Sequence, residues 1–254
     1  MTADPNDRYR APALDKGLDI LELLSEQPHG LTRGEIVKAM GRNPSEIYRM
    51  LERLVARHYV ARSPEGDRYS LSLKLFVLSQ RHPPLNRLVA RAQPAMEAFA
   101  NAAEQSCHLG IYDRGNITIV TQVSSPGKLG LSIRLGSRVS LIDTASGHVM
   151  LAFQSEPRRA EMLAAHEVLD GELPVPAGEL AATIASVREA GYWCGTSQQT
   201  WGVTDISMPI IATGGHAIAV ITCPFIRRID RHVGPDLEAT HRLLERTAKA
   251  LSID

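Results

Sequence analysis

The chain has 254 residues, with 28 basic and 28 acidic side chains and a formal net charge of zero, so the protein as a whole has no basic excess that would indicate nucleic-acid binding. This length allows one large domain or two smaller ones, each with a hydrophobic core. No apolar run reaches membrane-spanning length, the N-terminus has no apolar signal core, and three widely spaced cysteines do not form a disulfide framework, so we expect a cytoplasmic protein without a membrane partner.

The first predicted element is an amphipathic helix over residues 13–26. Leu14, Leu18, Leu21 and Leu24 recur at helical spacing and predict one apolar face. We expect this face to pack beneath the helices that follow.

Two short helices joined by a tight turn are predicted between residues 31 and 54. Thr32 is expected to cap the first helix, with Glu35 as its capping-box partner, and Gly41 to end it. Asn43 and Glu46 repeat the capping-box spacing at the start of the second helix.

The second of these helices has the pattern of a DNA-contacting helix. Ile47 and Leu51 lie on one face, whereas Ser45, Arg49 and Arg53 lie on another. One face would hold the helix to its domain while the other enters a DNA major groove. Residues 38–62 contain six basic and two acidic residues, a local excess that suits a dimer. Similar helix pairs also occur in domains that bind no DNA, and this alternative stays open here.

A strand-turn-strand pattern follows the second helix. The turn is Pro64-Glu65-Gly66-Asp67, which has the residue types of a tight hairpin. Arg62 and Arg68 lie on the two arms of this hairpin. The pattern indicates a wing that contacts the phosphate backbone.

An alanine-rich amphipathic helix is predicted between the two halves of the chain, from a domain boundary near residues 81–85. Pro94 lies inside it and would kink the helix or mark its restart. Its position suits a connecting or dimerising helix, although ordinary core packing explains the same pattern.

The C-terminal part predicts antiparallel strands with segregated helices, which is an α+β domain. Strands are expected in CHLGIYDRGNITIVTQV, in LGLSIRLGS and in DISMPIIATGGHAIAVITCPF. Helices are expected in HVMLAF, in PRRAEMLAAH, in ELAATIASVREAGYW and in PDLEATHRLLERTAKAL. Gly191 should end the third of these helices.

The segment GYWCGTSQQTWGVTD is the strongest candidate for lining a ligand pocket. It contains Trp193, Trp201 and Asp205, and a mostly apolar pocket with a few polar groups is how small organic ligands are held. The alternative is that these aromatic side chains only cover the core. Asp205 and Thr222 can orient a ligand through hydrogen bonds, although a threonine in a strand is usually a strand former.

An enzyme is a weaker interpretation of the same residues. Cys107 and His108 suggest a nucleophile and its base, but adjacent residues of a strand point to opposite faces. No nucleophile elbow, Walker loop or dinucleotide fingerprint is present. A metal site built on Cys107 and His108 is disfavoured, because buried inert cysteines explain the sequence better.

The ordered set of these segments resembles the IclR family of bacterial transcription regulators over roughly residues 13–252. The resemblance is carried by ALDKGLDILELL, by the helix pair at 31–54, by RYSLSLKLFVLS, and by CHLGIYDRGNITIVTQV, LGSRVSLIDTASGHVMLAF and WGVTDISMPIIATGGHAIAVITCP. It implies a winged helix-turn-helix DNA-binding domain (13–80), a linker and dimerisation helix (81–104) and a GAF-like α+β effector-binding domain (105–254).

The resemblance also implies partners and site residues. Members act as homodimers or tetramers on double-stranded, near-palindromic DNA operators and respond to a small-molecule effector. We expect no cofactor and no metal. The implied DNA-binding residues are Thr32, Arg42, Ser45, Tyr48, Arg49, Arg53, Arg62 and Arg68. The implied effector-binding residues are Leu131, Ile133, Thr144, Ala145, Ser146, Trp193, Trp201, Asp205, Ser207, Val220 and Thr222.

The chain departs from the family pattern at three positions. Glu46 replaces a small hydroxyl residue of the DNA-contacting helix and would cap it or accept from a cytosine amino group. His148 replaces a lysine, which would exchange a fixed charge for a neutral imidazole. Gln198 replaces a glutamate, which favours a less charged pocket entrance.

These observations predict a ligand-responsive, DNA-binding transcriptional regulator of a small-molecule catabolic operon, not an enzyme. The tryptophans favour an aromatic or otherwise apolar acid or amide as effector. One alternative is a metabolite-processing enzyme with an N-terminal winged-helix interaction module. A second is an architectural DNA-binding protein that responds to no ligand.

Overall fold

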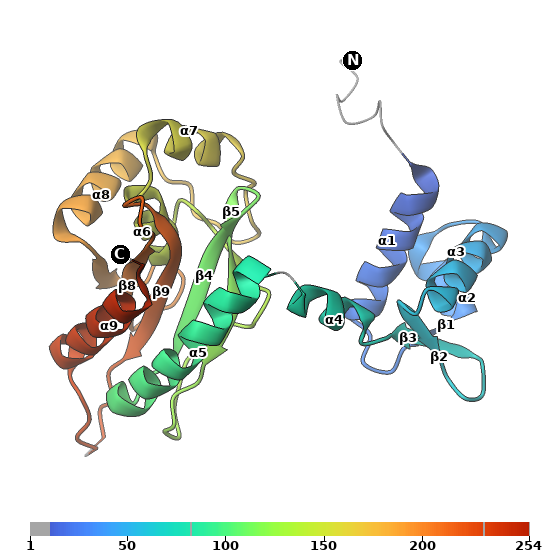
Figure 1. Cartoon of the computed structure of the whole chain (residues 1–254), viewed down its shortest axis with the longest axis horizontal. Helices are drawn as coiled ribbons and strands as arrows, with labels where there is room; N and C mark the ends of the chain where they lie inside the picture. Colours follow the sequence, from blue (N-terminus) through green and yellow to red (C-terminus); the bar gives the residue numbers. More distant parts are fainter. Residues whose placement is uncertain (1–10, 82, 231, 254) are drawn as a thin grey trace. The chain divides into compact units, whose positions relative to one another are not determined.

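The fold is that of a computed structural model, which describes residues 11–81, 83–230 and 232–253. The chain divides into two compact units, and the division falls between Asn86 and Arg87. Figure 1 shows the elements of both units.

The N-terminal unit is a winged helix-turn-helix domain, as predicted. Its elements are α1 (Pro12–Ser25), β1 (Leu31–Thr32), α2 (Arg33–Met40), α3 (Pro44–Ala56), β2 (Val60–Arg62), β3 (Arg68–Leu71) and α4 (Lys74–Gln80). The wing is an antiparallel sheet in the order β1-β3-β2 (Figure 1). Its core packs α1, α2 and α3 against the wing. The buried residues of this core are Ile20, Leu24, Ile36, Ile47, Leu51, Val60 and Tyr69.

The predicted capping box of α2 is confirmed. The Thr32 hydroxyl accepts from the Glu35 amide at 3.3 Å, and the Glu35 carboxylate accepts from the Thr32 amide at 2.7 Å. Gly41 ends the helix with φ 59°. At α3 only half of the predicted box forms: Asn43 accepts from the Ser45 amide, but Glu46 pairs with Lys16 of α1 at 2.7 Å.

The predicted apolar face of α1 is wrong in its first half. Leu14 and Leu18 are 61% and 48% exposed, whereas Ile20 and Leu24 are buried. The helix contacts α2, α3 and β3 mainly through its C-terminal half, so its first turns extend past the core of this unit.

Helix α4 was not predicted. Its sequence, KLFVLSQ, places apolar residues next to one another without helical period, and none of them is buried. Leu75, Phe76, Val77 and Leu78 are all exposed within the described chain.

Helix α5 (Pro83–Ala103) runs continuously through Pro94. Ala92, Met96 and Phe99 are buried in the core of the C-terminal unit. From Arg87 onward the helix is therefore part of that core as well as the connection to the N-terminal unit.

The C-terminal unit is built on one antiparallel sheet of six strands in the order β6-β5-β4-β9-β8-β7. These strands are β4 (Cys107–Asp113), β5 (Asn116–Val123), β6 (Arg138–Val139), β7 (Trp193–Thr196), β8 (Val203–Ile211) and β9 (Ala217–Ile226). The helices are α6 (Ala145–Ala152), α7 (Glu156–Ala164), α8 (Ala177–Ala190) and α9 (Leu237–Leu251). The predicted C-cap at Gly191 is confirmed by its φ of 89°.

The two faces of this sheet are covered by different helices. Helices α5 and α9 pack on one face, against side chains such as Leu109, Ile206 and Ile221 (Figure 1). Helices α6, α7 and α8 form the second core, with Ile117 and Val220 from the other face. This α+β arrangement agrees with the predicted fold class.

One predicted strand is wrong. LGLSIRLGS, residues 129–137, alternates apolar and polar residues but forms no strand. Leu129 and Leu135 are exposed, and Gly136 has a φ of 81°. Backbone bonds to the sheet begin only at Gly136 and Ser137, which pair with Ile119 of β5 just before the short β6.

The Thr32 cap gives a stability prediction. Thr32→Ala removes the acceptor for the Glu35 amide and is expected to lower the free energy of unfolding by about 1 kcal/mol. Urea unfolding of the full chain, followed by circular dichroism, measures this loss. The control is Ser25→Ala, because the exposed Ser25 hydroxyl only donates to the Glu22 carbonyl within α1. Equal stability of the two variants would contradict a stabilising cap.

Candidate DNA interface and ligand cavity

Helix α3 presents two free guanidinium groups to solvent. Ile47 and Leu51 are fully buried beneath it, whereas Arg49 and Arg53 are exposed on another face. Within the described residues, neither arginine side chain has a salt bridge or a hydrogen bond. They are therefore available to phosphates or to guanine edges.

The other predicted DNA-binding residues near α3 differ in how free their side chains are to bind DNA. Ser45 is exposed at the start of α3, and Tyr48 is 44% exposed beneath the Arg33 guanidinium, 5.4 Å from its ring centroid. Arg42 is exposed and lies 3.9 Å from Asp19. The hydroxyl of Thr32 is already used as the cap of α2.

The two wing arginines have partners inside the N-terminal unit that the sequence did not indicate. Arg62 donates to Glu52 and to the Tyr69 hydroxyl, and its guanidinium lies over the Tyr69 ring. Arg68 donates to the Gly30 carbonyl at 3.0 Å. Both arginines thus brace the wing, while their side chains remain partly exposed.

The C-terminal unit contains a cavity of about 300 Å³ on the sheet face opposite α5 and α9. The start of α6 and the loops at 169–172 and 197–200 complete its wall. Seven of the predicted effector residues line it: Leu131, Ile133, Thr144, Ala145, Ser146, Asp205 and Thr222.

Four predicted effector residues do not line this cavity. Trp201 is 98% exposed, and Trp193 lies against the His148 ring and the second core. Val220 is buried in the same core. Ser207 reaches the cavity only through the Thr222 hydroxyl, 2.7 Å away. The tryptophans of GYWCGTSQQTWGVTD do not line the cavity, but the same segment contributes Ser197, Gln199, Thr200 and Asp205 to its wall.

A chain of hydroxyl groups forms the polar floor of the cavity. The Thr222 hydroxyl lies 2.7 Å from that of Ser207 and 2.9 Å from that of Ser146. Strand register places Ser207, Thr222 and His108 side by side on adjacent strands. The floor is therefore fixed by strand pairing and by the first turn of α6.

His108 is a cavity residue that the sequence did not assign. Its side chain is almost fully buried, and it makes no hydrogen bond within the described residues. Burial lowers its pKa to about 4, so the ring is neutral near pH 7. Cys107 lies in the opposite core, as alternation predicts. The sequence signal for this role was that His108 is a polar residue on the face of a predicted strand that helices otherwise cover.

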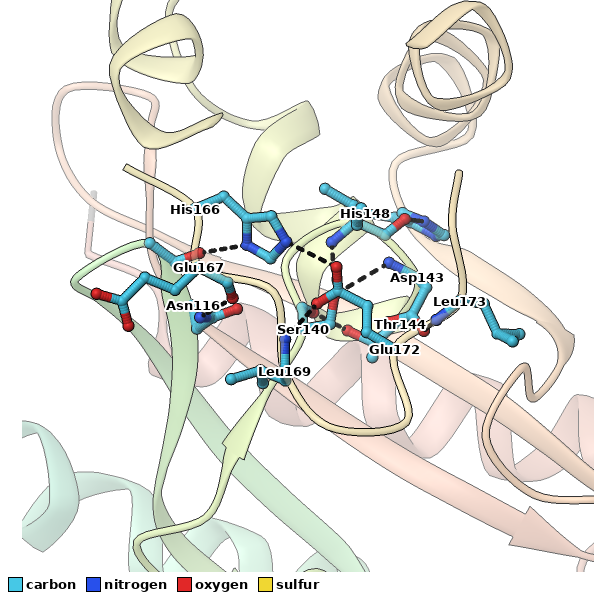
Figure 2. A network of polar contacts seen from close by, with 12 residues as sticks. Asn116, Ser140, Asp143, Thr144, His148, His166, Glu167, Leu169, Glu172 and Leu173 are labelled. Carbon is cyan, nitrogen blue, oxygen red and sulfur yellow. Dashed lines mark hydrogen bonds and ion pairs between the residues drawn. The ribbon is translucent and has the colours of Figure 1, made fainter. Parts of the chain in front are cut away.

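A network of buried polar contacts holds the loop that covers the cavity (Figure 2). Glu172 accepts from His166 Nε2 at 2.9 Å and from the Leu169 amide at 3.3 Å. His166 Nδ1 lies 2.9 Å from the Gly115 carbonyl. The ring therefore links the covering loop to the turn between β4 and β5.

Burial favours the neutral form of the Glu172 carboxyl. The hydrogen bonds from His166, Ser140 and the Leu169 amide, together with the His166 charge, outweigh it and lower the pKa of Glu172. The side chains of His166 and Glu172 are 9% and 3% exposed, so this pair is shielded from salt.

Asp143 ties two loops of the cavity wall together (Figure 2 shows its contact with Leu173). Its Oδ2 accepts from the Leu173 amide at 2.8 Å and from Gln199 Nε2 at 2.7 Å. Asn116 adds a third tie by donating to the Glu167 carbonyl at 2.9 Å.

His148 and Gln198 lie outside the cavity lining. His148 donates from Nε2 to the Ile142 carbonyl at 2.7 Å, and burial lowers the pKa of its ring. It therefore holds the turn before α6 as a neutral group. Gln198 is exposed.

The cysteines have the properties of unreactive side chains. Burial raises the pKa of Cys107 to about 12 and raises the pKa of Cys223 well above its usual range. Cys194 is exposed, and partial burial of its thiol also raises its pKa. In the described residues no group of three or more His, Cys, Asp or Glu side chains could hold a metal ion. Within those same ranges no helix is long and apolar enough to span a membrane.

The Glu172 network gives a pH prediction. Because the pKa of Glu172 is lowered on folding, its contribution to stability is present above its unfolded pKa and is lost as pH falls through its folded pKa. Glu172→Gln should lower the free energy of unfolding by about 2 kcal/mol at about pH 7, since it loses charged hydrogen bonds.

Melting temperatures of wild type and Glu172→Gln measure this difference, which should shrink below about pH 4. Glu167→Gln is the control, because Glu167 pairs with Arg138 at an exposed position. If the wild type keeps the same higher melting temperature in acid, the Glu172 carboxylate is not the source of the difference.

Both units match models of one protein family. The match is to the IclR helix-turn-helix domain over residues 13–64 and to the C-terminal region of bacterial transcriptional regulator IclR over residues 85–253. HTH-type transcriptional regulator KdgR of Escherichia coli (strain K12) is 30% identical over 213 residues, which cover 83% of this chain and 80% of that protein. HTH-type transcriptional regulator XynR of the same strain is 26% identical, with 83% and 84% covered.

Solved structures show the same fold over both units. The Thermotoga maritima IclR has a TM-score of 0.74 at 22% identity, with 94% of this chain and 96% of that chain covered. An IclR homolog from Microbacterium hydrocarbonoxydans, complexed with 4-hydroxybenzoate, has a TM-score of 0.75 at 20% identity, with 94% and 97% covered. The chain belongs to the IclR family of bacterial transcriptional regulators.

Proposed function

We propose that this regulator binds a DNA operator and changes its DNA binding when a small molecule occupies the cavity of its C-terminal unit. One observation carries the proposal: the same chain contains a helix with free guanidinium groups and, in its other unit, a cavity lined by both polar and aliphatic side chains. In this proposal the protein controls a small-molecule catabolic operon and has no catalytic role.

In the proposed complex, α3 enters the major groove. Arg49 and Arg53 contact bases or adjacent phosphates, with Ser45, Tyr48 and Arg42 beside them. Arg62 and Arg68 contact the backbone from the wing while keeping their internal bonds. Thr32 contributes by holding the start of α2.

We propose a homodimer, alone or as half of a tetramer. The exposed apolar side chains of α1 and α4, among them Leu14, Leu18 and Phe76, support a second copy as their partner. A two-fold dimer presents two α3 helices and therefore fits a near-palindromic operator. The ligand controls binding only if it has different affinity for two arrangements of the dimer.

The DNA role predicts a specific loss in Arg49→Ala. The substitution should weaken operator binding by about 1–3 kcal/mol if Arg49 makes a bidentate base contact. The measurement is a gel-shift titration of the full chain, using a duplex selected from random sequence by the wild-type protein. Arg114→Ala is the matched control, because Arg114 is highly exposed in the C-terminal unit. Wild-type affinity in Arg49→Ala would remove this residue from the interface.

The dimer predicts an effect of charge on α4. Phe76→Glu places a carboxylate on the proposed interface and should increase the monomer fraction, since burying an unpaired charge is costly. Sedimentation of the full chain measures the fraction, with Val168→Glu as an exposed control in the C-terminal unit. If both variants match the wild type, α4 is not the dimer contact.

A further inference from the structure

The hydrogen-bonding groups, charges and apolar side chains of the cavity lining restrict the class of ligand that it can bind. This inference rests on the proposed function, because it assumes that the cavity is the effector site. The cavity, at about 300 Å³, is at the lower end of the about 300–1,000 Å³ typical of small-molecule sites. Its occupant must therefore be compact.

The buried, unpartnered imidazole of His108 is the first restriction. A neutral imidazole has one N–H donor and one acceptor nitrogen, and within the described chain neither is used. Buried polar groups in folded proteins nearly always have a partner. A ligand hydroxyl both donates and accepts, so it can satisfy either nitrogen of the ring.

The floor beside His108 is also polar. Ser146 and Thr222 line the cavity, and their hydroxyls belong to a chain of three whose two internal contacts leave one hydroxyl proton unused. The backbone amides of Ala145 and Ser146, the first residues of α6, make no hydrogen bond within the described residues. They can donate to a carboxylate or carbonyl oxygen of the ligand.

Carboxylates form the third restriction. Asp205, Asp170 and Glu172 all line the cavity. Arg138 is the cationic side chain of the lining, and it pairs with Glu167 at 2.9 Å. Carboxylates accept hydrogen bonds, and a buried acceptor that receives no donor is costly. The ligand must therefore bring several donors of its own.

The apolar part of the lining is aliphatic. It consists of Leu131, Ile133, Val139, Ala145, Leu169 and Pro224, with no phenylalanine, tyrosine or tryptophan. The tryptophans that favoured an aromatic effector lie elsewhere. Short aliphatic contacts suit the carbon chain of a small molecule whose remaining surface is polar.

We propose that the cavity binds a small non-aromatic carboxylic acid with several hydroxyl groups, and that His108 bonds one of those hydroxyls. The carboxylate lies at the amides of Ala145 and Ser146. The other hydroxyls donate to Asp205 and to the carboxylates of the covering loop. The loop held by Glu172 and His166 forms one wall around the ligand, and Figure 2 shows the contacts that hold this loop.

Thermal shift and calorimetry on the full chain test the ligand class. The probes are D-glycerate, L-tartrate, D-gluconate and D-galactonate, each at millimolar concentration. The controls are hexanoate, an aliphatic acid without hydroxyl groups, and 4-hydroxybenzoate. At least one hydroxylated acid should raise the melting temperature by mass action, and neither control should. A shift with a control but with no hydroxylated acid overturns the proposal, as does no shift with any probe.

Two substitutions then test His108 with the acid that binds. His108→Leu should weaken its binding by at least about tenfold, because a ligand hydroxyl loses its partner in a closed site. His108→Gln keeps one donor and one acceptor and should restore most of the affinity. Trp201→Ala, at an exposed position, should bind as the wild type does. Unchanged binding by His108→Leu overturns the role of His108.

Operator binding by the same proteins separates the two proposals. If the wild-type protein binds its selected operator but none of the hydroxylated acids, the proposed ligand class alone is wrong. If the wild-type protein binds the acids but no DNA, the proposed function is wrong instead.

Discussion

The antiparallel pairing of β4 with β9 at the centre of the large sheet determines what each face of the C-terminal unit can do. Leu109 lies opposite Ile221, and both face the core formed with α5 and α9. His108 lies opposite Thr222, and both face the cavity. Since side chains alternate along a strand, a register shift of one residue would place the imidazole in an apolar core. The cavity and the main core are thus specified by the same hydrogen-bond ladder.

The cavity also depends on buried polar contacts that are satisfied mostly by neighbouring loops. Glu172, Asp143 and Asn116 each bind a backbone group of the segment 167–173. Such contacts are costly to break without a replacement, so they hold a loop in one place although it has no regular secondary structure. A loop fixed in this way can cover a ligand although residues 167–173 belong to neither apolar core of this unit.

Local sequence patterns predicted the elements that have local causes. The capping box at Thr32, the wing turn and the C-cap at Gly191 all involve residues close in sequence, and the structure has each of them. The existence of strands β4, β5, β8 and β9 followed from their alternation. The two-unit α+β architecture followed as well, because the segments occur in the order shared by the family.

The failures involve partners that are distant in sequence. Glu46 was assigned to a cap, but Lys16 lies 30 residues earlier and binds it instead. Residues 129–137 alternate like a strand, yet only Gly136 and Ser137, at the end of the segment, bond to the backbone of a strand, at Ile119 of β5. Trp193 and Trp201 were predicted to line a mostly apolar pocket, whereas the apolar part of the cavity lining is aliphatic. His108 had no local motif and became visible only through register with Thr222.

The bond between Lys16 and Glu46 has a consequence for the electrostatics of DNA approach. Glu46 is the acidic residue in the first turn of α3, and the hydrogen bond and charge of Lys16 lower its pKa. The carboxylate stays ionised, but the ammonium of α1 offsets its field within a few ångströms, so a phosphate near Arg49 meets a weaker repulsion. The first helix, which lies outside the helix-turn-helix pair, thereby contributes to the potential at the DNA-facing surface. Any movement of α1 relative to α3 would change that potential at the side chains that we propose to contact DNA.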